Sequence, residues 1–242
     1  MKKVKFLVSV KNTQEISEAL LNEIDILDLK DPSKGSIGSW HDSEIKKVTK
    51  LFKYKIKISA TLGDIFDNEE FKNSLDIFDN LNLDFVKFGL LSFAQESLFE
   101  KLKLISLKNY KTPLVCVVFV DHKKTIEIVN QNISLFFNAG INHILLDTFR
   151  KDTGNLLDFC NKNFLEGFIF RCEQYNIKVG LAGGLKESIM PLLLCLRPDI
   201  AGFRSAVCDL NKRESSLKIE KVKRISFYLK SLRSNATESA GT

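Results

Sequence analysis

The chain has 242 residues, of which 44% are hydrophobic and 27% are charged. This composition is ordinary for a globular protein and excludes a wholly disordered chain. A content of 19 phenylalanines and only 4 prolines also excludes collagen-like and proline-rich classes. At about 100–200 residues per domain, the length corresponds to one large domain or two small ones.

The net charge of +6 is concentrated near the C-terminus. Between positions 212 and 233 only Glu214 and Glu220 are acidic, and the basic residues there account for the whole excess. They are Lys212, Arg213, Lys218, Lys221, Lys223, Arg224, Lys230 and Arg233. Such a segment is usually the solvated face of a terminal helix. It also leaves open a surface that binds nucleic acid or a protein partner.

The cysteines and histidines carry no sign of a disulfide framework or a metal site. The five cysteines are odd in number and none has metal-ligand spacing. His41, His122 and His143 are far apart in the chain, which argues against a shared metal ion. Free thiols suit a reducing cytosol, so we expect a cytoplasmic protein. No apolar run is long enough to span a membrane or to form the core of a signal peptide.

Eight short apolar runs, rich in β-branched residues, predict strands along the whole chain. They are Val4–Val10, Ile26–Lys30, Lys57–Gly63, Phe85–Leu90, Leu114–Val120, His143–Thr148, Lys178–Gly183 and Ile200–Val207. Several are almost continuously hydrophobic, which is typical of strands that are buried on both faces.

Segments with helical periodicity separate these strands. The clearest are Thr13–Glu23 with Thr13 as a possible cap, Ser92–Lys108, Lys123–Asn138 and Ser215–Leu232. Eight strand-then-helix units predict a (β/α)₈ or TIM barrel, with an open doubly wound sheet as the alternative. We expect one catalytic domain over residues 1–234, followed by a disordered polar tail at 235–242.

In such a barrel the active site lies at the C-terminal ends of the strands. Polar residues stand at or near these ends: Asp28, Lys30, Thr61, Lys87, Asp121, Asp147 and Lys151. Asp28 and Lys30 are two positions apart and therefore face the same side of their strand. Lys87 lies between Val86 and Phe88, where a charge is costly unless it is paired or functional.

A lysine inside a barrel can act as a nucleophile. Burial and neighbouring cations lower its pKa, so that the neutral amine attacks a carbonyl to form a Schiff base or accepts a proton. The alternative is that each lysine extends to solvent or forms half of a buried ion pair.

Glycines follow the last two predicted strands. Gly183 and Gly184 precede a helical segment, and Arg204 and Ser205 follow the final strand. Backbone N–H groups at such glycines can approach a phosphate, and an arginine adds positive charge. The alternative is that these glycines only make tight turns.

Taken together, these motifs resemble the (5-formylfuran-3-yl)methyl phosphate synthase family of methanofuran biosynthesis. The resemblance extends from about Val4 to Cys208. Its segments are Asp28–Gly38, Ser59–Asp64, Asp84–Leu90, Asp147–Asp152, Leu181–Gly183 and Gly202–Cys208. Ser205 departs from the family pattern, which has glycine beside the arginine.

The resemblance implies a (β/α)₈ lyase that needs no cofactor or metal. Two molecules of glyceraldehyde 3-phosphate would be condensed into the furan phosphate, with loss of one phosphate and water. Lys30 matches the Schiff-base lysine and Lys87 the proton acceptor. Asp28, Asp147, Lys151 and Asp121 match or accompany the other polar residues of the site, and Lys123 is the candidate for a further family lysine. Thr61, Gly183, Gly184, Arg204 and Ser205 would contact the phosphorylated substrate.

The residues suggest how the reaction would proceed. An imine at Lys30 acidifies the adjacent C–H bond, Lys87 removes that proton, and the enamine attacks a second aldehyde. Asp28 or Asp147 would shuttle protons during dehydration. The partner is then a small phosphorylated triose rather than nucleic acid or a membrane, and a homo-oligomer is as compatible with the sequence as a monomer. The alternatives are another Schiff-base aldolase acting on a different sugar phosphate, or a non-catalytic barrel that binds nucleic acid or a partner through its basic terminal helix.

Overall fold

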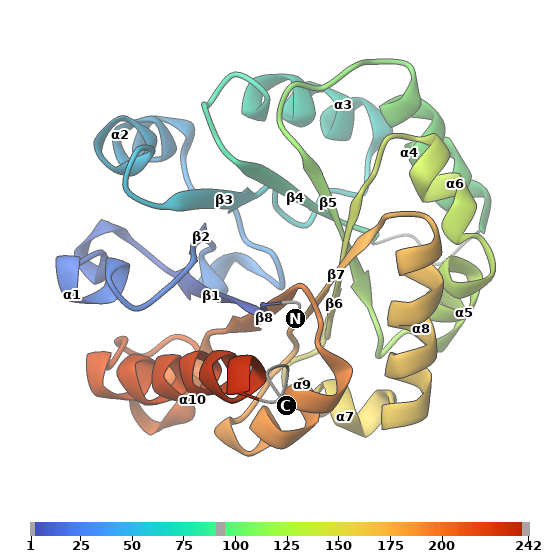
Figure 1. Ribbon diagram of the computed structural model, residues 1–242. Coiled ribbons are helices and arrows are strands. Elements are labelled where there is room, and N and C mark those ends of the chain that lie inside the picture. The colour runs from blue at the N-terminus through green and yellow to red at the C-terminus, as the bar shows by residue number, and fades with distance from the viewer. Residues whose placement is uncertain (1–2, 91–94, 239–242) are drawn as a thin grey trace.

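Eight parallel strands close into a barrel in sequential order (Figure 1). The computed structural model describes residues 3–90 and 95–238. The strands are β1 Lys5–Val10, β2 Ile26–Leu29, β3 Lys57–Thr61, β4 Phe85–Gly89, β5 Leu114–Phe119, β6 His143–Asp147, β7 Lys178–Leu181 and β8 Ile200–Phe203. Pairing of β1 with β8 completes the ring, so the prediction of a (β/α)₈ barrel is confirmed and the open sheet is excluded.

The helices lie outside the strands (Figure 1). The α-helices are α1 Glu18–Leu21, α2 Asp42–Phe52, α3 Asn68–Phe78, α4 Gln95–Ser106, α5 Lys123–Gln131, α6 Ile133–Asn138, α7 Leu156–Phe159, α8 Lys162–Gln174, α9 Met190–Leu196 and α10 Ile219–Glu238. Short 3₁₀ turns join them at η1 Thr13–Glu15, η2 Pro32–Lys34, η3 Glu187–Ile189, η4 Ser205–Val207 and η5 Asp209–Asn211.

Local signals explain where the helices begin and which side they bury. The side chain of Asn161 accepts a hydrogen bond from the backbone N–H of Phe164 at 2.9 Å and so caps α8. Leu165, Phe168 and Cys172 recur at helical spacing and are fully buried. This apolar stripe packs α8 against the barrel, as a 3.6-residue period requires.

Several predicted boundaries differ from those observed. The helix expected over residues 13–23 is divided into η1 and α1, and Ser17 rather than Thr13 caps α1. The helix expected over residues 123–138 breaks at Asn132 into α5 and α6. The last helix begins at Ile219 rather than Ser215 and continues to Glu238, within the expected tail. Residues 92–94 of the expected fourth helix and residues 239–242 of the tail lie outside the described residues.

Alternation along the strands separates two apolar layers. Leu27 and Leu29 face the layer between strands and helices, whereas Ile26 faces the barrel interior with Leu7, Val115 and other apolar residues. Toward the C-terminal ends the interior becomes polar. The strand register places Ser9, Asp28 and Ser59 side by side on β1, β2 and β3. A polar layer of the barrel is thus open to chemistry at the end where such folds carry their active sites.

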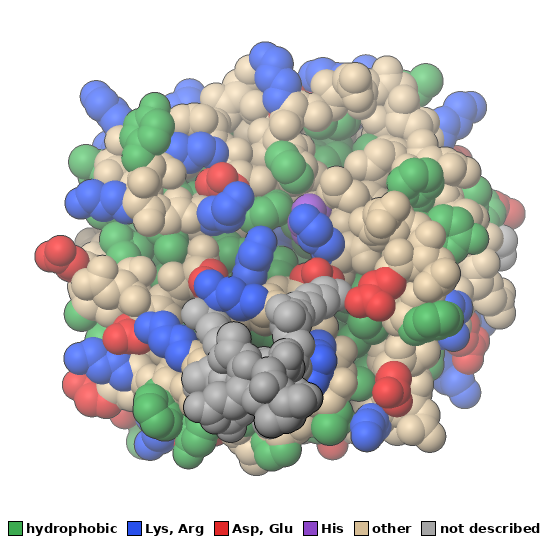
Figure 2. All heavy atoms as spheres, viewed as in Figure 1, with side chains coloured by type: hydrophobic (Ala, Val, Ile, Leu, Met, Phe, Trp, Pro, Cys, Tyr) green, Lys and Arg blue, Asp and Glu red, His purple; other side chains and the backbone are tan. Residues whose placement is uncertain are grey.

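The opposite end of the barrel is closed by charges of both signs. His143 is buried there beside the side chains of Lys5, Lys57, Lys178 and Asp199, and burial lowers its pKa to about 4. Figure 2 shows basic and acidic side chains around the centre of one face of the molecule. Among the described residues, no helix is both long and apolar enough to cross a membrane.

Candidate active site

A cavity of about 870 Å³ lies at the C-terminal ends of the strands. Lys30, Lys87, Asp147, Lys151 and Arg213 are among the residues that line it. Its volume falls within the range of about 300–1,000 Å³ that is typical of small-molecule sites.

Asp28 and Lys87 form a buried ion pair at the floor of the site. Lys87 Nζ lies 2.5 Å from Asp28 Oδ1, and the two side chains are 3% and 0% exposed. The hydroxyls of Ser59 and Ser9 each donate a hydrogen bond of 2.7 Å to the same carboxylate. Burial favours the neutral forms of both groups. Asp28 nevertheless keeps a lowered pKa because Lys87 and Lys30 stabilise its charge.

The amine of Lys87 is also easier to deprotonate than that of an ordinary lysine. Burial is the main cause of its lowered pKa, and the positive charge of Lys30 acts in the same direction, while Asp28 opposes both. A lysine of this kind is suited to accept a proton from a bound substrate.

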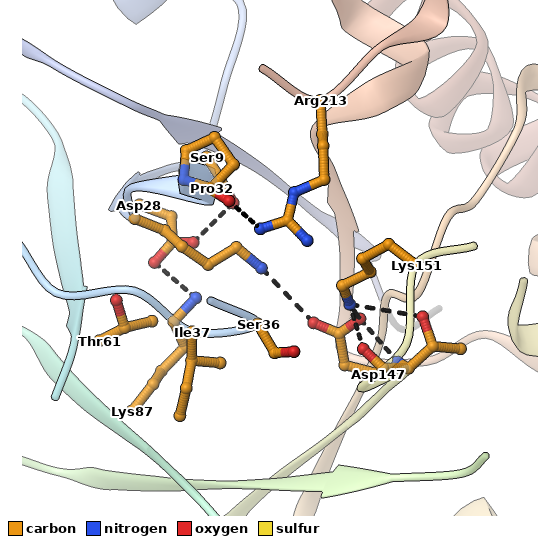
Figure 3. Close-up of polar contacts among 12 residues, drawn as sticks. Ser9, Asp28, Pro32, Ser36, Ile37, Thr61, Lys87, Asp147, Lys151 and Arg213 are labelled. Atoms are coloured by element: carbon orange, nitrogen blue, oxygen red, sulfur yellow. Dashed lines mark hydrogen bonds and ion pairs between the residues drawn. The ribbon is translucent and has the colours of Figure 1, made fainter. Parts of the chain in front are cut away.

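Asp147 at the end of β6 joins two further lysines (Figure 3). Its Oδ2 lies 3.5 Å from Lys30 Nζ, and its Oδ1 lies 2.7 Å from Lys151 Nζ. The N–H of Thr148 donates to Oδ1 at 2.8 Å, and Lys151 also donates to the carbonyl of Thr148. Although burial raises the pKa of Asp147, Lys151 and Lys30 outweigh it and hold this carboxyl well below its usual range. Burial lowers the pKa of Lys151.

The barrel therefore brings together five of the residues predicted from the sequence: Asp28, Lys30, Lys87, Asp147 and Lys151. Lys30 acts electrostatically on the other four, so its amine stands between the two carboxylate pairs. The side chain of Lys30 is 12% exposed and lines the cavity, which leaves the amine accessible to a bound aldehyde.

Gly183 and Gly184 line the same cavity and adopt left-handed backbone conformations, with φ of 82° and 66°. A Cβ atom at Gly183 would lie 2.9 Å from the backbone nitrogen of Thr148. Glycine is thus needed here both for its conformation and for close packing against the end of β6. Ser205 also lines the cavity, at the start of η4.

Three expectations from the sequence are corrected by these contacts. The carboxylate of Asp121 accepts hydrogen bonds of 2.7 Å from the N–H groups of Phe149 and Arg150, so it holds the loop after β6 rather than facing a substrate. The hydroxyl of Thr61 is fully buried and donates to the carbonyl of Gly38 at 2.9 Å. Lys123 is 90% exposed on α5, where it lies 3.9 Å from Glu127. None of the three lines the main cavity.

Arg204 lines the cavity but is not available to a phosphate. Its Nη1 and Nη2 atoms donate to the Glu15 carboxylate at 2.5 and 3.0 Å. The remaining N–H donors bind the carbonyls of Ser9, Arg213 and Ser215. All five donors are therefore satisfied within the protein. These contacts link β8 and the loop after it to β1 and to η1. The expectation that Arg204 binds substrate phosphate is corrected accordingly.

Sequence reasoning missed Arg213 and Ser9. The sequence analysis counts Arg213 only with the basic residues of the C-terminal segment, whereas it lies at the cavity in the loop before α10, which begins at Ile219. The available signal was its position ahead of the predicted start of that helix at Ser215. Ser9 is a small polar residue on the inward face of an apolar strand, and its partner Asp28 could not be known without the barrel register.

Among the described residues, no cluster of three or more His, Cys, Asp or Glu side chains could hold a metal ion. The cysteines among them are free thiols, of which Cys195 is exposed.

A closed (β/α)₈ barrel with paired lysines and carboxylates at its C-terminal mouth defines a TIM-barrel protein with a cationic small-molecule site. The model of the 4-HFC-P synthase family matches residues 6–226. The chain therefore belongs to this family, and the resemblance in its strand-end motifs is confirmed.

Curated relatives agree with this assignment. The chain is 30% identical over 233 residues to a protein of Methanosarcina mazei named (5-formylfuran-3-yl)methyl phosphate synthase, covering 92% of this chain and 97% of that one. A protein of the same name from Methanocaldococcus jannaschii is 26% identical over 223 residues, covering 86% and 92%.

Solved structures support the barrel fold alone. 3-Hexulose-6-phosphate synthase from Salmonella typhimurium superposes with a TM-score of 0.64 at 13% identity, covering 95% of this chain and 100% of that one. Phosphoribosyl anthranilate isomerase from Thermus thermophilus gives a TM-score of 0.60 at 15% identity, with the same coverage.

Proposed function

We propose that this chain is a cytoplasmic lyase that makes (5-formylfuran-3-yl)methyl phosphate from two molecules of glyceraldehyde 3-phosphate. The observation that carries the proposal is the placement of the Lys30 amine between Lys87–Asp28 and Lys151–Asp147 in a cavity. The name of the curated relatives supplies the product. No metal or organic cofactor has a part in the proposed reaction.

The carbon skeleton of the product determines which bond must form. The phosphate-bearing methylene and ring carbons 3 and 2 are one intact triose, and the formyl carbon and ring carbons 5 and 4 are the other. The new carbon–carbon bond therefore joins C2 of the triose that keeps its phosphate to C3 of the triose that loses it. An enamine that attacked an aldehyde carbon, as expected from the sequence, would join different atoms. One phosphate and two waters complete the balance.

Lys30 is the nucleophile in this scheme. Its amine forms an imine with C1 of the triose that loses phosphate, which makes the hydrogen on C2 acidic. Lys87 accepts that proton, and the electron pair left behind expels phosphate from C3. The conjugated iminium that results is electrophilic at C3. The second triose attacks it from C2 as its enediol, which forms when the C2 proton of that triose moves to its C1 oxygen.

Ring closure and then loss of two waters give the aromatic furan. The C2 oxygen of the triose on Lys30 attacks the aldehyde of the other triose, and each dehydration step needs a group that passes a proton to a departing hydroxyl. Asp147 and Lys151 are proposed for these transfers, while Asp28 holds Lys87 in position and raises its pKa. Hydrolysis of the imine releases the formyl group and regenerates Lys30.

The test is to incubate the pure protein with glyceraldehyde 3-phosphate and to follow ultraviolet absorbance and inorganic phosphate together. We expect one phosphate for each furan aldehyde formed. Lys30→Ala should abolish both signals, and borohydride should trap substrate on Lys30 of the wild type. Lys87→Ala should slow the reaction by about 10²–10⁴-fold.

Lys123→Ala is the matched control, because that lysine is exposed on the outside of α5. It should retain full activity. Full activity of Lys30→Ala would exclude the imine mechanism. Trapping at Lys30 without any furan product would instead indicate a Schiff-base enzyme for another sugar phosphate.

A further inference from the structure

Two arginines in the segment after β8 form opposite kinds of contact. All donors of Arg204 are satisfied by Glu15 and backbone carbonyls. Arg213 uses only Nη2, which donates to the carbonyls of Pro32 at 2.7 Å and Gly35 at 2.6 Å. Within the described part of the chain, its Nε and Nη1 have no hydrogen-bond partner and its guanidinium has no carboxylate within ion-pair distance. Arg213 is thus a half-buried cation with free donors at the cavity.

The free donors of Arg213 lie in the part of the cavity that holds Lys151 and Asp147. Figure 3 shows its guanidinium extending from the β8 side between Pro32 and Lys151, with Asp147 below. Its charge acts on Lys151, and the charge of Asp147 acts on it in turn. A group bound between Arg213 and Lys151 would therefore lie beside the Lys30–Asp147 pair.

The charges around Asp147 do not balance. Lys30, Lys151 and Arg213 are three cations that interact with this one carboxylate. Glu214 and Asp64 also act on Arg213, but Asp147 does so most strongly, and the surplus of positive charge beside Asp147 favours a bound anion such as phosphate. Guanidinium and ammonium groups bind phosphate through charge-assisted hydrogen bonds, and the planar guanidinium can offer two donors at once.

The hydrogen bonds of Arg213 to backbone carbonyls also hold its side chain in place. Pro32 and Gly35 belong to the loop that directly follows Lys30, so Arg213 links the loop after β8 to the loop after β2. That loop is held from the other side by Asp64, which accepts hydrogen bonds from the N–H groups of Ser36 and Ile37. Nη2 is therefore held in place while Nε and Nη1 remain free for a ligand.

We propose that Arg213 binds the phosphate of the triose that forms the imine with Lys30, which is the phosphate that leaves. This rests on the proposed function for the identity of the triose, and on the geometry alone for the binding of a phosphate dianion. Lys151, whose three donors are taken by Asp147 and Thr148, adds its positive charge nearby. The phosphate-bearing carbon of that triose is only two carbons from the imine carbon, so its phosphate has to lie close to Lys30. A cation at this point stabilises the charge that develops as the phosphate departs.

The first experiment measures binding of inorganic phosphate by titration calorimetry, without any reaction. Arg213→Met should weaken binding about tenfold or more, because a charge-assisted hydrogen bond is lost. Arg213→Lys, which keeps the charge, should restore part of the affinity and serves also if the Met variant folds poorly. Arg171→Gln is the control, since Arg171 contacts Asn130 on the outer helix α8. Wild-type affinity in both Arg213 variants, or no binding by the wild type, would overturn the proposal.

The second experiment separates phosphate binding from loop positioning. Borohydride trapping at Lys30 is compared for glyceraldehyde 3-phosphate and for unphosphorylated glyceraldehyde, both below saturation. Arg213→Met should reduce trapping of the phosphorylated aldehyde about tenfold and leave the other unchanged. An equal loss for both would mean that Arg213 only shapes the loop after Lys30, which would overturn the proposal.

The two proposals fail in different ways. If the wild type forms no furan but Arg213→Met still loses phosphate affinity, the reaction is wrong and the phosphate site stands. If furan forms and the Arg213 variants match the wild type in KM, kcat and phosphate affinity, the reaction stands and the site is wrong.

Discussion

At the scale of single residues, three lysines show how surroundings determine the chemistry of one side-chain type. Lys87 is paired with Asp28 at 2.5 Å, and Lys30 lies 3.5 Å from Asp147 at the edge of a cavity. Lys101 on α4 is 1% exposed, and its ammonium lies 4.4 Å from the centre of the Phe71 ring. Its hydrogen bond to the carbonyl of Ile65 is long, at 3.5 Å. Only the first two are placed to act on a ligand.

The Lys87–Asp28 pair makes a pH prediction. Lys87 has to be neutral to accept a proton, and Asp28 raises its pKa against the lowering effect of burial. Asp28→Asn removes that opposing charge, so the acid limb of kcat/KM should shift to lower pH even if kcat falls. Ser59→Ala leaves the charge of Asp28 in place and should shift the limb much less. A shift to higher pH in Asp28→Asn would contradict Lys87 as the proton acceptor.

Lys101 leads to a prediction about stability. Burial lowers its pKa, so the folded state binds this proton less readily than the unfolded chain. Lys101→Met keeps the aliphatic stem and should raise the free energy of unfolding by about 1 kcal/mol at pH 7, measured by urea denaturation. The gain should vanish as the pH rises above about 10.4, where the lysine of the unfolded chain is also neutral.

The exposed Lys108, which lies 2.7 Å from Asp76, provides the control. Lys108→Met should change the free energy of unfolding by no more than about 0.5 kcal/mol. A clear loss of stability in Lys101→Met would instead show that the contact with the Phe71 ring outweighs the cost of burying the charge.

At the scale of elements, hydrogen bonds between the loops after the strands hold the reactive groups in position at the mouth of the barrel. Asp121 after β5 holds the loop after β6, and Arg213 after β8 holds the loop after β2. Arg204 and Glu15 join β8 to η1. Each contact is made between segments that are adjacent around the barrel mouth or across it, which explains why no single loop defines the site.

Substitutions at two glycines with nearly the same φ angle can test the close packing at the end of β7. Gly183 has φ of 82° and Gly140 has φ of 81°, but a Cβ would meet backbone only at Gly183. Gly140→Ala should cost about 1 kcal/mol of stability from its conformation alone. Gly183→Ala should cost more and should also slow furan formation, because Thr148 and the adjacent Asp147 must move. Equal stability and activity in the two variants would contradict this account.

At the scale of the whole molecule, the positive charge of the C-terminal segment is largely used within the chain. Lys218, Arg224 and Lys230 lie within 4.0 Å of Asp209, Glu187 and Glu23 respectively. Lys221 donates to the carbonyl of Cys208 at 2.8 Å. Arg224, Lys230 and Lys221 lie on α10, and Lys218 directly precedes it.

We therefore expect no measurable binding of DNA or RNA at about 0.15 M salt, in a filter-binding or anisotropy assay. Non-specific binding proteins at this salt have dissociation constants of about 10⁻⁴–10⁻⁶ M. Binding in that range that falls steeply with salt and survives Lys30→Ala would favour a nucleic-acid partner over the enzyme.

The barrel and the core of its site were predictable from local patterns. Eight apolar runs, several of which carry polar residues at or near their C-terminal ends, imply eight strands whose ends meet at one mouth. That rule alone brings Asp28, Lys30, Lys87, Asp147 and Lys151 together, as observed. Such patterns depend on periods of two and 3.6 residues, which are properties of short segments.

The loop residues were not predictable in the same way. Asp121, Thr61 and Arg204 have the residue types of a site, yet they satisfy backbone groups of other loops. Arg213 appeared to belong to a helix surface but reaches the loop after Lys30, 178 residues away in the chain from Gly35. A charged side chain at a strand end binds whichever polar group the closed barrel places beside it. That group is set by long-range packing of the loops, because a polar group must find a partner only when packing buries it.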